Sequence, residues 1–409
     1  GGEIDPEATR NILGVEFPVK GEEGMLSARS TSLTHGTTHH GENYHYPPGL
    51  RRLATTYYHR LGPVGAIMER YNWFQTEQRR AEFKMSAAER AKLDKERPTG
   101  QYRYTADARL PAAMVAQGFA ALNAGLPVEQ IANAWSEPPY ATIGLGTGTM
   151  ASYGRPYQHV TFYEIDDEIR KFSEPFTFAT DEIPTDQKGW DEKIGMDPDA
   201  KLIRRPYFNY LHDAALRGAA VEVVMGDART SMEHEDHPGR ISTGPYFPLR
   251  KHYYKVIEVD AFSSDAIPIH LITKEAIQLY IDHITDDGVV MVHTSNRHVD
   301  LVQPVVNIAQ ELKLDWRVGN DVAIPARRKG IDQYALGFTN SEYVMLAKKP
   351  GILRDLYKLP GESTAAYERQ VWDPDLQPVR RSLVGWYKPP PPDHRLWTDD
   401  YTNILQIYR

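Results

Sequence analysis

The chain of 409 residues contains no cysteine. This absence excludes disulfides, thiolate metal ligands and a cysteine nucleophile, and it favours a reducing compartment. Long apolar runs are also missing: no stretch approaches the roughly 20 residues that a membrane span needs, and the first residues lack the profile of a signal peptide. We therefore expect a soluble, cytoplasmic chain, tethered at a membrane only if a longer parent protein carries membrane segments.

Long blocks of Lys or Arg are absent too, and the formal net charge is −8 at pH 7. This balance argues against duplex nucleic acid as the main partner and suits a cationic small molecule. The pattern GxxxxGK[ST] of a Walker-type phosphate loop does not occur. Hydrophobic residues make up 41% of the chain and charged residues 25%, which are ordinary values for a globular protein with a sizeable core.

What is present is an alternation of strand-like and helix-like segments. The strand-like segments are short and β-branched: ATIGLG, HVTFYEID, VEVVMGD, YKVIEVDAF and GVVMVHTSN. The segments KEAIQLYIDHI and LVQPVVNIAQEL have helical spacing. Together they predict an α/β domain with a mostly parallel sheet, to which SEYVMLAKK adds an antiparallel strand at one edge.

Composition divides the chain into four regions. Residues 1–62 form a β-rich region with hairpins, residues 63–135 a helical insertion or linker, residues 136–350 the α/β domain, and residues 351–409 a C-terminal extension. An inserted loop interrupts the α/β domain at about 175–206. The segment SAAERAKLDKER predicts a solvated surface helix, and the proline-rich KPPPPDHRLW predicts an extended chain that wraps the domain.

A glycine-rich turn follows the first strand of the α/β domain, with Gly144, Gly146 and Gly148 in GLGTG. In a strand-loop-helix unit, such glycines let the backbone approach a ligand, and the next helix presents free N–H groups to it. Glu164 ends the following strand, where an acid typically accepts hydrogen bonds from ribose hydroxyls. The two features together predict an adenosine-containing cofactor in this domain.

Asp227 ends the third strand, in the segment VVMGDARTS. Its carboxylate is placed to accept a hydrogen bond from an adenine amino group, and we include the adjacent Ala228 among the cofactor-binding candidates. The alternative is that Asp227 caps the helix that begins at Ala228, which is a common role for Asp after a strand.

The fourth strand runs into a Ser-rich turn flanked by Asp260 and Asp265. Open α/β sheets bind ligands at this end of their strands. An alkylammonium group with a pKa of about 10 must lose a proton before it attacks carbon, and Asp260 fits the role of the base. Asp265 can hold the amine by a charge-assisted hydrogen bond, with Ser263 in the same pocket. Alternatively, Ser263, Ser264 and Asp265 cap the next helix.

The region from Ala141 to Asn296 resembles the spermidine synthase (polyamine aminopropyltransferase) family, especially its bacterial spermidine synthase-like branch, which is often fused to membrane segments. The segments that carry the resemblance are GLGTGTMASYGRP, FYEIDDEI, VVMGDARTS, DAFSSDAIPIHLIT and WTDDYTNIL, with LTHGTTHHGEN and ATTYY upstream. It implies a Rossmann-like, methyltransferase-type sheet with an N-terminal β region, and aminopropyl transfer from decarboxylated S-adenosylmethionine to an amine in polyamine biosynthesis.

The resemblance also implies roles for single residues. Glu164 takes the ribose role, Asp227 the adenine role and Asp260 the role of the catalytic aspartate, while Asp265 matches the last residue of a DSSD motif that is spread here over DAFSSD. We further expect a homo-oligomer.

Thr147 departs from the family pattern. Characterised members carry GGGDG, in which the Asp pairs with the amine of the cofactor's three-carbon arm, and Thr147 stands in its place. An acid would repel the carboxylate of intact S-adenosylmethionine, so its absence removes one reason to exclude that cofactor. The donor is therefore decarboxylated or intact S-adenosylmethionine. One alternative function is a methyltransferase or another user of the intact cofactor; another is a non-catalytic adenosine-binding or assembly module.

Histidines crowd the N-terminal region at positions 35, 39, 40 and 45. Their spacing fits no standard ligand set, and we predict no metal site. The resemblance instead implies that His39, with Tyr57 and Tyr58, lines the pocket of the amine acceptor. Asp399 and Asp400 either belong to that pocket or cap a helix.

Overall fold

The structure is a computed structural model, and it describes 17 stretches of the chain: residues 11–16, 29–35, 38–46, 53–60, 62–72, 138–154, 158–174, 206–216, 219–234, 240–242, 251–261, 268–296, 299–320, 338–353, 356, 384–389 and 396–402. The surface helix predicted in SAAERAKLDKER and the inserted loop predicted at about 175–206 lie outside these residues, apart from residue 206.

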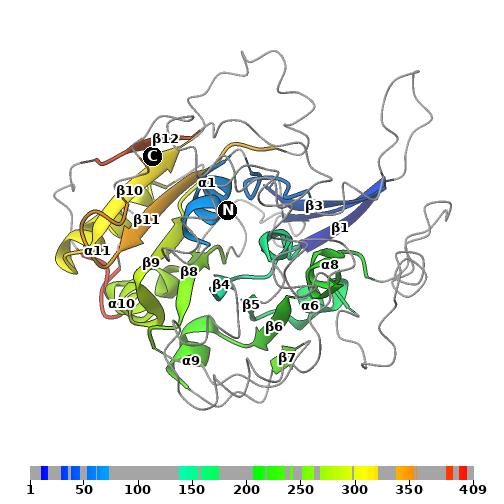
Figure 1. The fold of residues 1–409 in the computed structure, drawn as a ribbon, viewed down its shortest axis with the longest axis horizontal. Coiled ribbons are helices and arrows are strands. Elements are labelled where there is room, and N and C mark those ends of the chain that lie inside the picture. Colours follow the sequence, from blue (N-terminus) through cyan, green and yellow to red (C-terminus); the bar gives the residue numbers. More distant parts are fainter. Residues whose placement is uncertain are drawn as a thin grey trace, which may run out of the picture.

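A nine-stranded sheet forms the centre of the molecule, in the order β12-β10-β11-β9-β8-β4-β5-β6-β7 (Figure 1). Its strands are β4 (Tyr140–Ile143), β5 (His159–Glu164), β6 (Ala220–Met225), β7 (Arg240–Ser242), β8 (Tyr254–Val259), β9 (Ile284–His293), β10 (Asp315–Asn320), β11 (Glu342–Ala347) and β12 (Gly385–Tyr387). Strands β6, β5, β4, β8 and β9 are parallel neighbours, as the alternation of strands and helices predicts.

The segment SEYVMLAKK forms β11, which is antiparallel to β9 as predicted. It does not lie at the edge, because β10 and then β12 continue the sheet beyond it. Strand β10 has the sequence DWRVGN, in which charged residues, glycine and asparagine hide the strand from a propensity pattern. The prediction of an edge strand is therefore corrected to an internal antiparallel strand.

The chain winds outward from β4 in both directions, to β5 and β6 on one side and to β8 and β9 on the other. Helices follow these strands along the chain, as expected of crossover connections. The predicted Rossmann-like, methyltransferase-type fold is thereby confirmed. In such open sheets the ligand crevice lies outside the carboxyl ends of the strands, at the point where the winding reverses. Here that point is the end of β4, between β5 and β8.

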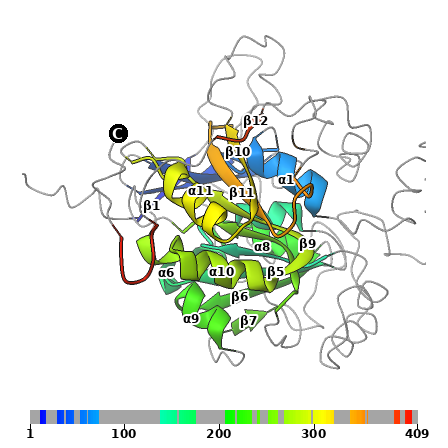
Figure 2. The ribbon, with the colours of Figure 1, turned by 90° about the vertical axis from the view of Figure 1, so that its left-hand side faces the viewer.

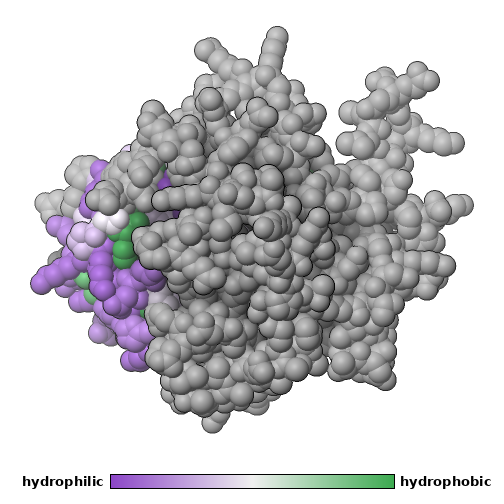
Figure 3. All heavy atoms as spheres, viewed as in Figure 1, coloured by the Kyte–Doolittle hydropathy of each residue, from purple (hydrophilic) through white to green (hydrophobic). Residues whose placement is uncertain are grey.

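Helices cover both faces of the sheet. They are α1 (Pro63–Tyr71), η3 (Thr149–Tyr153), α6 (Asp167–Phe172), α8 (Tyr210–Leu216), α9 (Ala228–Glu233), η5 (Ile269–Leu271), α10 (Lys274–His283) and α11 (Val302–Glu311). Helices α9, α10 and α11 pack on one face (Figure 2), and α1, η3 and α8 pack on the other. The described surface around α10 and α11 is largely hydrophilic (Figure 3), as expected of helices whose apolar side faces the sheet.

A separate antiparallel sheet stands at the N-terminal side, with β1 (Asn11–Glu16), β2 (Arg29–His35) and β3 (Thr38–Tyr46). It contains the hairpins that the alternating segments predict. The side chain of Asn43 accepts a hydrogen bond from the backbone N–H of Asn209 (2.7 Å), and the Tyr210 hydroxyl donates to the carbonyl of Leu53 (2.7 Å). These contacts join the small sheet, and the segment after it, to the α8 side of the main sheet.

Candidate functional site: a cavity at the carboxyl ends of β4, β5, β6 and β8

A cavity of about 210 Å³ opens at the carboxyl ends of β4, β5, β6 and β8. Its lining includes eight of the candidate residues from the α/β domain and the segment before it: Tyr57, Tyr58, Gly144, Gly146, Glu164, Asp227, Ala228 and Asp260. The ends of neighbouring parallel strands meet at one edge of a sheet, which explains how residues that are far apart in the chain come together.

The glycine-rich turn forms the floor of the cavity next to Asp260. Gly144 has a φ of 100°, and a Cβ at this position would lie 2.5 Å from the carbonyl oxygen of Asp260. Only glycine accepts both the positive φ and this approach without strain. The Asp260 N–H donates to the carbonyl of Ile143 at 2.9 Å, so the start of the turn and the end of β8 are locked to each other.

Glu164, the last residue of β5, holds the glycine-rich turn from the other side. Its Oε2 accepts a hydrogen bond from the N–H of Leu145 and its Oε1 accepts one from the N–H of Asp166, both at 2.8 Å. The side chain is mostly buried at 7% exposure, and burial raises the pKa of this carboxyl although the two backbone N–H groups act in the opposite sense. Each carboxylate oxygen has two acceptor sites. The carboxylate can therefore accept further hydrogen bonds in addition to those from the backbone, and Glu164 lines the cavity.

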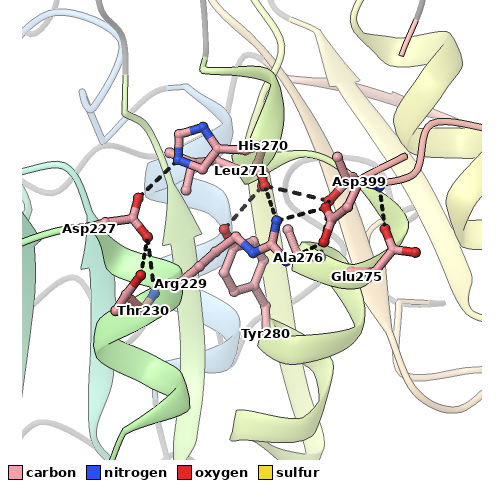
Figure 4. A network of polar contacts seen from close by, with 10 residues as sticks. Asp227, Arg229, Thr230, His270, Leu271, Glu275, Ala276, Tyr280 and Asp399 are labelled. Carbon is pink, nitrogen blue, oxygen red and sulfur yellow. Dashed lines mark hydrogen bonds and ion pairs between the residues drawn. The ribbon is translucent and has the colours of Figure 1, made fainter. Parts of the chain in front are cut away.

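Asp227 caps a helix, as one of the two alternatives from the sequence predicts, and it also lines the cavity. Its Oδ1 accepts from the N–H of Thr230 at 3.0 Å and so caps α9, while its Oδ2 pairs with Nε2 of His270 at 2.9 Å (Figure 4). Burial raises the pKa of Asp227, but the hydrogen bonds from Thr230 and His270 outweigh it and hold the pKa below the ordinary value. Asp227 and His270 together form one wall of the cavity.

Asp260 lies deepest and is held by two side chains. The Tyr58 hydroxyl donates to Oδ2, and Nδ1 of His293 lies 2.6 Å from Oδ1. Burial, and next the negative charge of Asp260, raise the pKa of Tyr57 and Tyr58 well above the ordinary value, so both phenols stay protonated at neutral pH. A protonated Tyr58 orients the carboxylate by donating to it; the Asp260 side chain is fully shielded from solvent, while the residue as a whole lines the cavity.

A layer of buried groups supports Asp260 from behind. Glu258 and Asp260 alternate with apolar residues along β8, which places both carboxyls on the same face of the sheet. The His293 ring stacks on Tyr343, with centroids 4.5 Å apart, and it lies 4.4 Å from the ring of Tyr57. Burial and the charge of Asp260 raise the pKa of Glu258 well above the ordinary value. Glu258 therefore lies on the same face of the sheet as Asp260, with its pKa raised by burial.

Two predicted cofactor residues do not line the cavity. The side chain of Thr147 is fully buried, with its hydroxyl 2.6 Å from that of Thr149 and its methyl and hydroxyl groups against Gly41 of β3. Gly148 caps η3, a short 3₁₀ helix where the sequence predicts a longer helix, and it faces Leu211 instead. The positive φ values at Gly146 and Gly148 turn the backbone between them away from the cavity.

Several other predicted site residues lie outside the cavity lining or outside the residues that the structure describes. Asp265 and Ser263 lie outside the described residues, and of His39 the structure describes the backbone in β3 but not the side chain. The neighbouring His40 lines the cavity. Asp399 is not among the lining residues: it pairs with Arg229 at 2.7 Å.

Sequence reasoning missed three residues of the site: Glu258, His270 and His293. The alternation in VIEVDAF contains a signal for Glu258, since a residue two positions before Asp260 shares its face. His270 follows the Ser-rich turn, in a segment whose sequence pattern points to its acids and not to a histidine. His293 ends β9 in the segment GVVMVHTSN, at the same edge of the sheet as Asp260, which is the signal that places it there.

The cavity has an acidic character. Of the described residues that line it, Glu164, Asp166, Asp227 and Asp260 carry carboxylates, while none is Lys or Arg. Carboxylates grouped in a partly enclosed site create a potential that favours cations. The site is thus suited to a positively charged ligand or to two of them.

Comparisons with known proteins gave only distant matches. No protein-family model matches the chain. No curated protein matches it either. Solved structures with a similar fold include a probable spermidine synthase from Corynebacterium glutamicum ATCC 13032, at 13% identity and a TM-score of 0.36, with 88% of this chain and 83% of that chain covered.

Two further neighbours are a spermidine synthase and a methyltransferase-like protein. The spermidine synthase from Thermotoga maritima has 14% identity and a TM-score of 0.27, over 53% of this chain and 56% of that chain. Human methyltransferase-like protein 13, in complex with SAH, has 14% identity and a TM-score of 0.30, over 71% of this chain and 98% of that chain. At these values the likeness transfers no function, and the chemistry depends on the cavity itself.

Two further observations concern the described part of the chain. No helix there has the length and apolar character that crossing a bilayer requires. Within the same residues, no three side chains of His, Asp or Glu gather in a way that could hold a metal ion.

Proposed function

We propose that this protein transfers an aminopropyl or related alkyl group from an S-adenosyl cofactor to a small cationic amine. The observation that carries the proposal is that Glu164 and Asp260 face one acidic cavity, joined by the glycine-rich turn. A sulfonium donor and an ammonium acceptor are both cations, and the carboxylates of the cavity would favour both.

The β5 side of the cavity fits an adenosine group. The free acceptor sites of Glu164 suit two ribose hydroxyls, and a Cβ at Gly146 would meet no atom within 4 Å, so the turn leaves open space next to them. Ile165 follows Glu164, lines the cavity and is 73% exposed, an unusual state for so large an apolar side chain. It offers an apolar face for the adenine ring.

The β8 side fits the proton transfer that the reaction requires. The amine nitrogen must lose a proton to present a lone pair, which then forms the new N–C bond while the C–S bond of the sulfonium breaks and its electron pair stays on sulfur. Asp260 takes the proton, with Tyr58 and His293 fixing its two oxygens. The products are the alkylated amine and the uncharged thioether of adenosine.

A methyl transfer from intact S-adenosylmethionine is the second candidate, and the residue at position 147 does not exclude it. No acid stands at this position, and the Thr147 side chain is buried against β3. A carboxylate that would repel the intact cofactor is therefore missing at this point of the turn.

The by-product separates the two reactions. Purified protein is incubated with an amine and with either decarboxylated or intact S-adenosylmethionine, and the adenosine product is identified by mass spectrometry. We expect methylthioadenosine from the decarboxylated donor. S-adenosylhomocysteine would instead establish the methyltransferase, and a protein that binds the cofactors without forming either product would be a binding module.

A further inference from the structure

The C-terminal segment, residues 396–402, lies against the start of α10 and near the cavity wall. Trp397 anchors it: the side chain is 2% exposed within the core of the α10 face, and its carbonyl accepts a hydrogen bond from the N–H of Lys274 at 2.9 Å. A second pair of backbone bonds closes a turn between Thr398 and Tyr401. The segment is therefore a fixed part of this face.

Asp399 makes the polar contacts of the C-terminal segment. Its two carboxylate oxygens accept from Nη1 and Nη2 of Arg229 at 2.8 Å and 2.7 Å, which is a bidentate pair (Figure 4). The hydroxyl of Thr273 donates to the same carboxylate at 2.7 Å, and Glu275 accepts from the Asp399 N–H at 2.9 Å. Asp399 is thus held from three sides in one orientation.

Arg229 connects Asp399 to the residues of the cavity wall. Its Nη1 also donates to the backbone carbonyl of His270 at 3.0 Å. The His270 ring in turn pairs with Asp227 through Nε2, at 2.9 Å, and both of these residues line the cavity (Figure 4). A continuous series of contacts therefore runs from Asp399 through Arg229 and His270 to Asp227.

We propose that Asp399 is a positioning residue for the adenosine part of the cavity, acting through Arg229 on His270 and Asp227. The proposal deepens the proposed function and rests on it. Without the carboxylate, the Arg229 guanidinium loses its fixed direction and the His270 backbone loses a fixed donor. The His270 ring then adopts other orientations, so the cavity wall that binds the adenine ring is less well preorganised.

The alternative role for Asp399 is purely structural, and its exposure speaks against a large effect of that kind. The Asp399 side chain is about two-fifths exposed, and ion pairs at such positions contribute little to stability. A structural role predicts a change in melting temperature with unchanged ligand affinity. The positioning role predicts the reverse.

The test compares Asp399→Asn with Asp400→Asn. Asn keeps the shape and loses the bidentate acceptor, while Asp400 is an exposed neighbour on the same segment that does not line the cavity. Calorimetric titration with S-adenosylmethionine and with methylthioadenosine should show at least fivefold weaker binding for Asp399→Asn, a melting temperature close to that of the parent, and parental binding for Asp400→Asn. Equal affinity in parent and Asp399→Asn would overturn the proposal.

Two further measurements test the same proposal with a second variant and a second readout. Arg229→Lys keeps the charge but not the planar fork, and it should weaken binding in the same direction even if Asp399→Asn folds poorly. In ¹⁵N spectra of the histidine rings, Asp399→Asn should move the His270 signals toward those of Asp227→Asn; unchanged ring signals reject the proposal. If the parent binds neither nucleoside, the proposed function fails and this proposal fails with it; if only the Asp399 effect is missing, this proposal fails alone.

Discussion

The two sides of the cavity use carboxylates in opposite environments. On the adenosine side, Asp227 is half-buried and its pKa is held low by the hydrogen bonds of a helix cap and a histidine. On the β8 side, the proposed reacting side, the Asp260 carboxylate is shielded from solvent among aromatic rings, near Glu258, whose pKa is raised by burial. The binding side is therefore built from local backbone contacts, whereas the reacting side depends on the packing of distant segments.

This difference indicates which substitutions should change ligand affinity alone and which should change the rate or the stability. A substitution on the adenosine side should alter affinity with little effect on folding, because the partners of Glu164 and Asp227 are backbone groups of adjacent segments and the exposed ring of His270. A substitution on the reacting side should alter either the rate or the stability, because its partners come from β8, β9 and residues 53–60. The following predictions test that contrast.

The largest expected effect is on turnover in Asp260→Asn. The amide keeps the shape of the side chain and cannot take a proton, so turnover with the best amine should drop by about 10²–10⁴-fold. Cofactor affinity, measured by titration, should stay close to that of the parent, and so should the melting temperature. A variant that retains the parental rate would show that Asp260 is not the base and that the two sides do not differ in this way.

Thr147→Asp should act on stability rather than on binding. Its carboxylate would be buried next to Thr149 and Gly41, where the described residues provide no cationic partner, and an uncompensated buried charge costs roughly 3–5 kcal/mol. Urea unfolding gives this value directly. Thr147→Val is the matched control, with the loss of about one hydrogen bond, ~1 kcal/mol. A stable Thr147→Asp protein that prefers the decarboxylated donor would instead place this side chain in the donor site.

Glu164→Ala should weaken the binding of both S-adenosyl cofactors by roughly 1.5–3 kcal/mol, the scale of a hydrogen bond to a charged group. Titration calorimetry measures the change, and Glu164→Gln is the control because it keeps the length of the side chain and one carbonyl acceptor. Unchanged affinity in Glu164→Ala would show that the ribose lies elsewhere and that the β5 side is not the adenosine side.

The smallest expected effect is a change in pH dependence for Glu258→Gln. Because burial raises the pKa of Glu258, the folded protein keeps this proton at pH values at which the unfolded chain has released it. The free energy of unfolding should therefore fall as the pH rises above about 4.5, by up to about 1.4 kcal/mol per pH unit, until the folded pKa is reached.

Gln cannot titrate, so denaturant unfolding at several pH values should show a flatter profile for Glu258→Gln, with the difference growing toward high pH. Glu233, an exposed residue at the end of α9, provides the matched control variant Glu233→Gln. Parallel profiles for the parent and Glu258→Gln would mean that Glu258 is ionised in the folded protein.

The sequence located the β5 and β6 side of the cavity better than the β8 side, for a physical reason. Gly144, Glu164 and Asp227 act through neighbours that are close in the chain or on adjacent strands, so strand ends and turn residues locate them. The partners of Asp260 are a tyrosine before α1 and a histidine at the end of β9. No local pattern states which of two tyrosines donates to an aspartate on another strand.

The Thr147 side chain shows a second limit of prediction from the sequence. Its place in the glycine-rich turn is clear from the sequence, but its direction depends on the φ angles of Gly146 and Gly148. Likewise, the cap and cavity roles of Asp227 looked like alternatives, and the structure joins them because the two carboxylate oxygens point to different partners. The edge position expected for β11 failed because β10 and β12 lack a strong strand pattern.

The close packing of Gly144 on the carbonyl of Asp260 has a consequence for protein engineering. The turn beneath the donor and the strand that carries the base share one backbone contact with no room for a side chain, so neither can be shifted without the other. Libraries that aim to change the donor should therefore keep Gly144 and also Gly146, whose φ of 52° strains other residues, and vary the exposed Ile165. Acceptor preference can then be varied independently through the N-terminal side of the cavity, at positions such as His40.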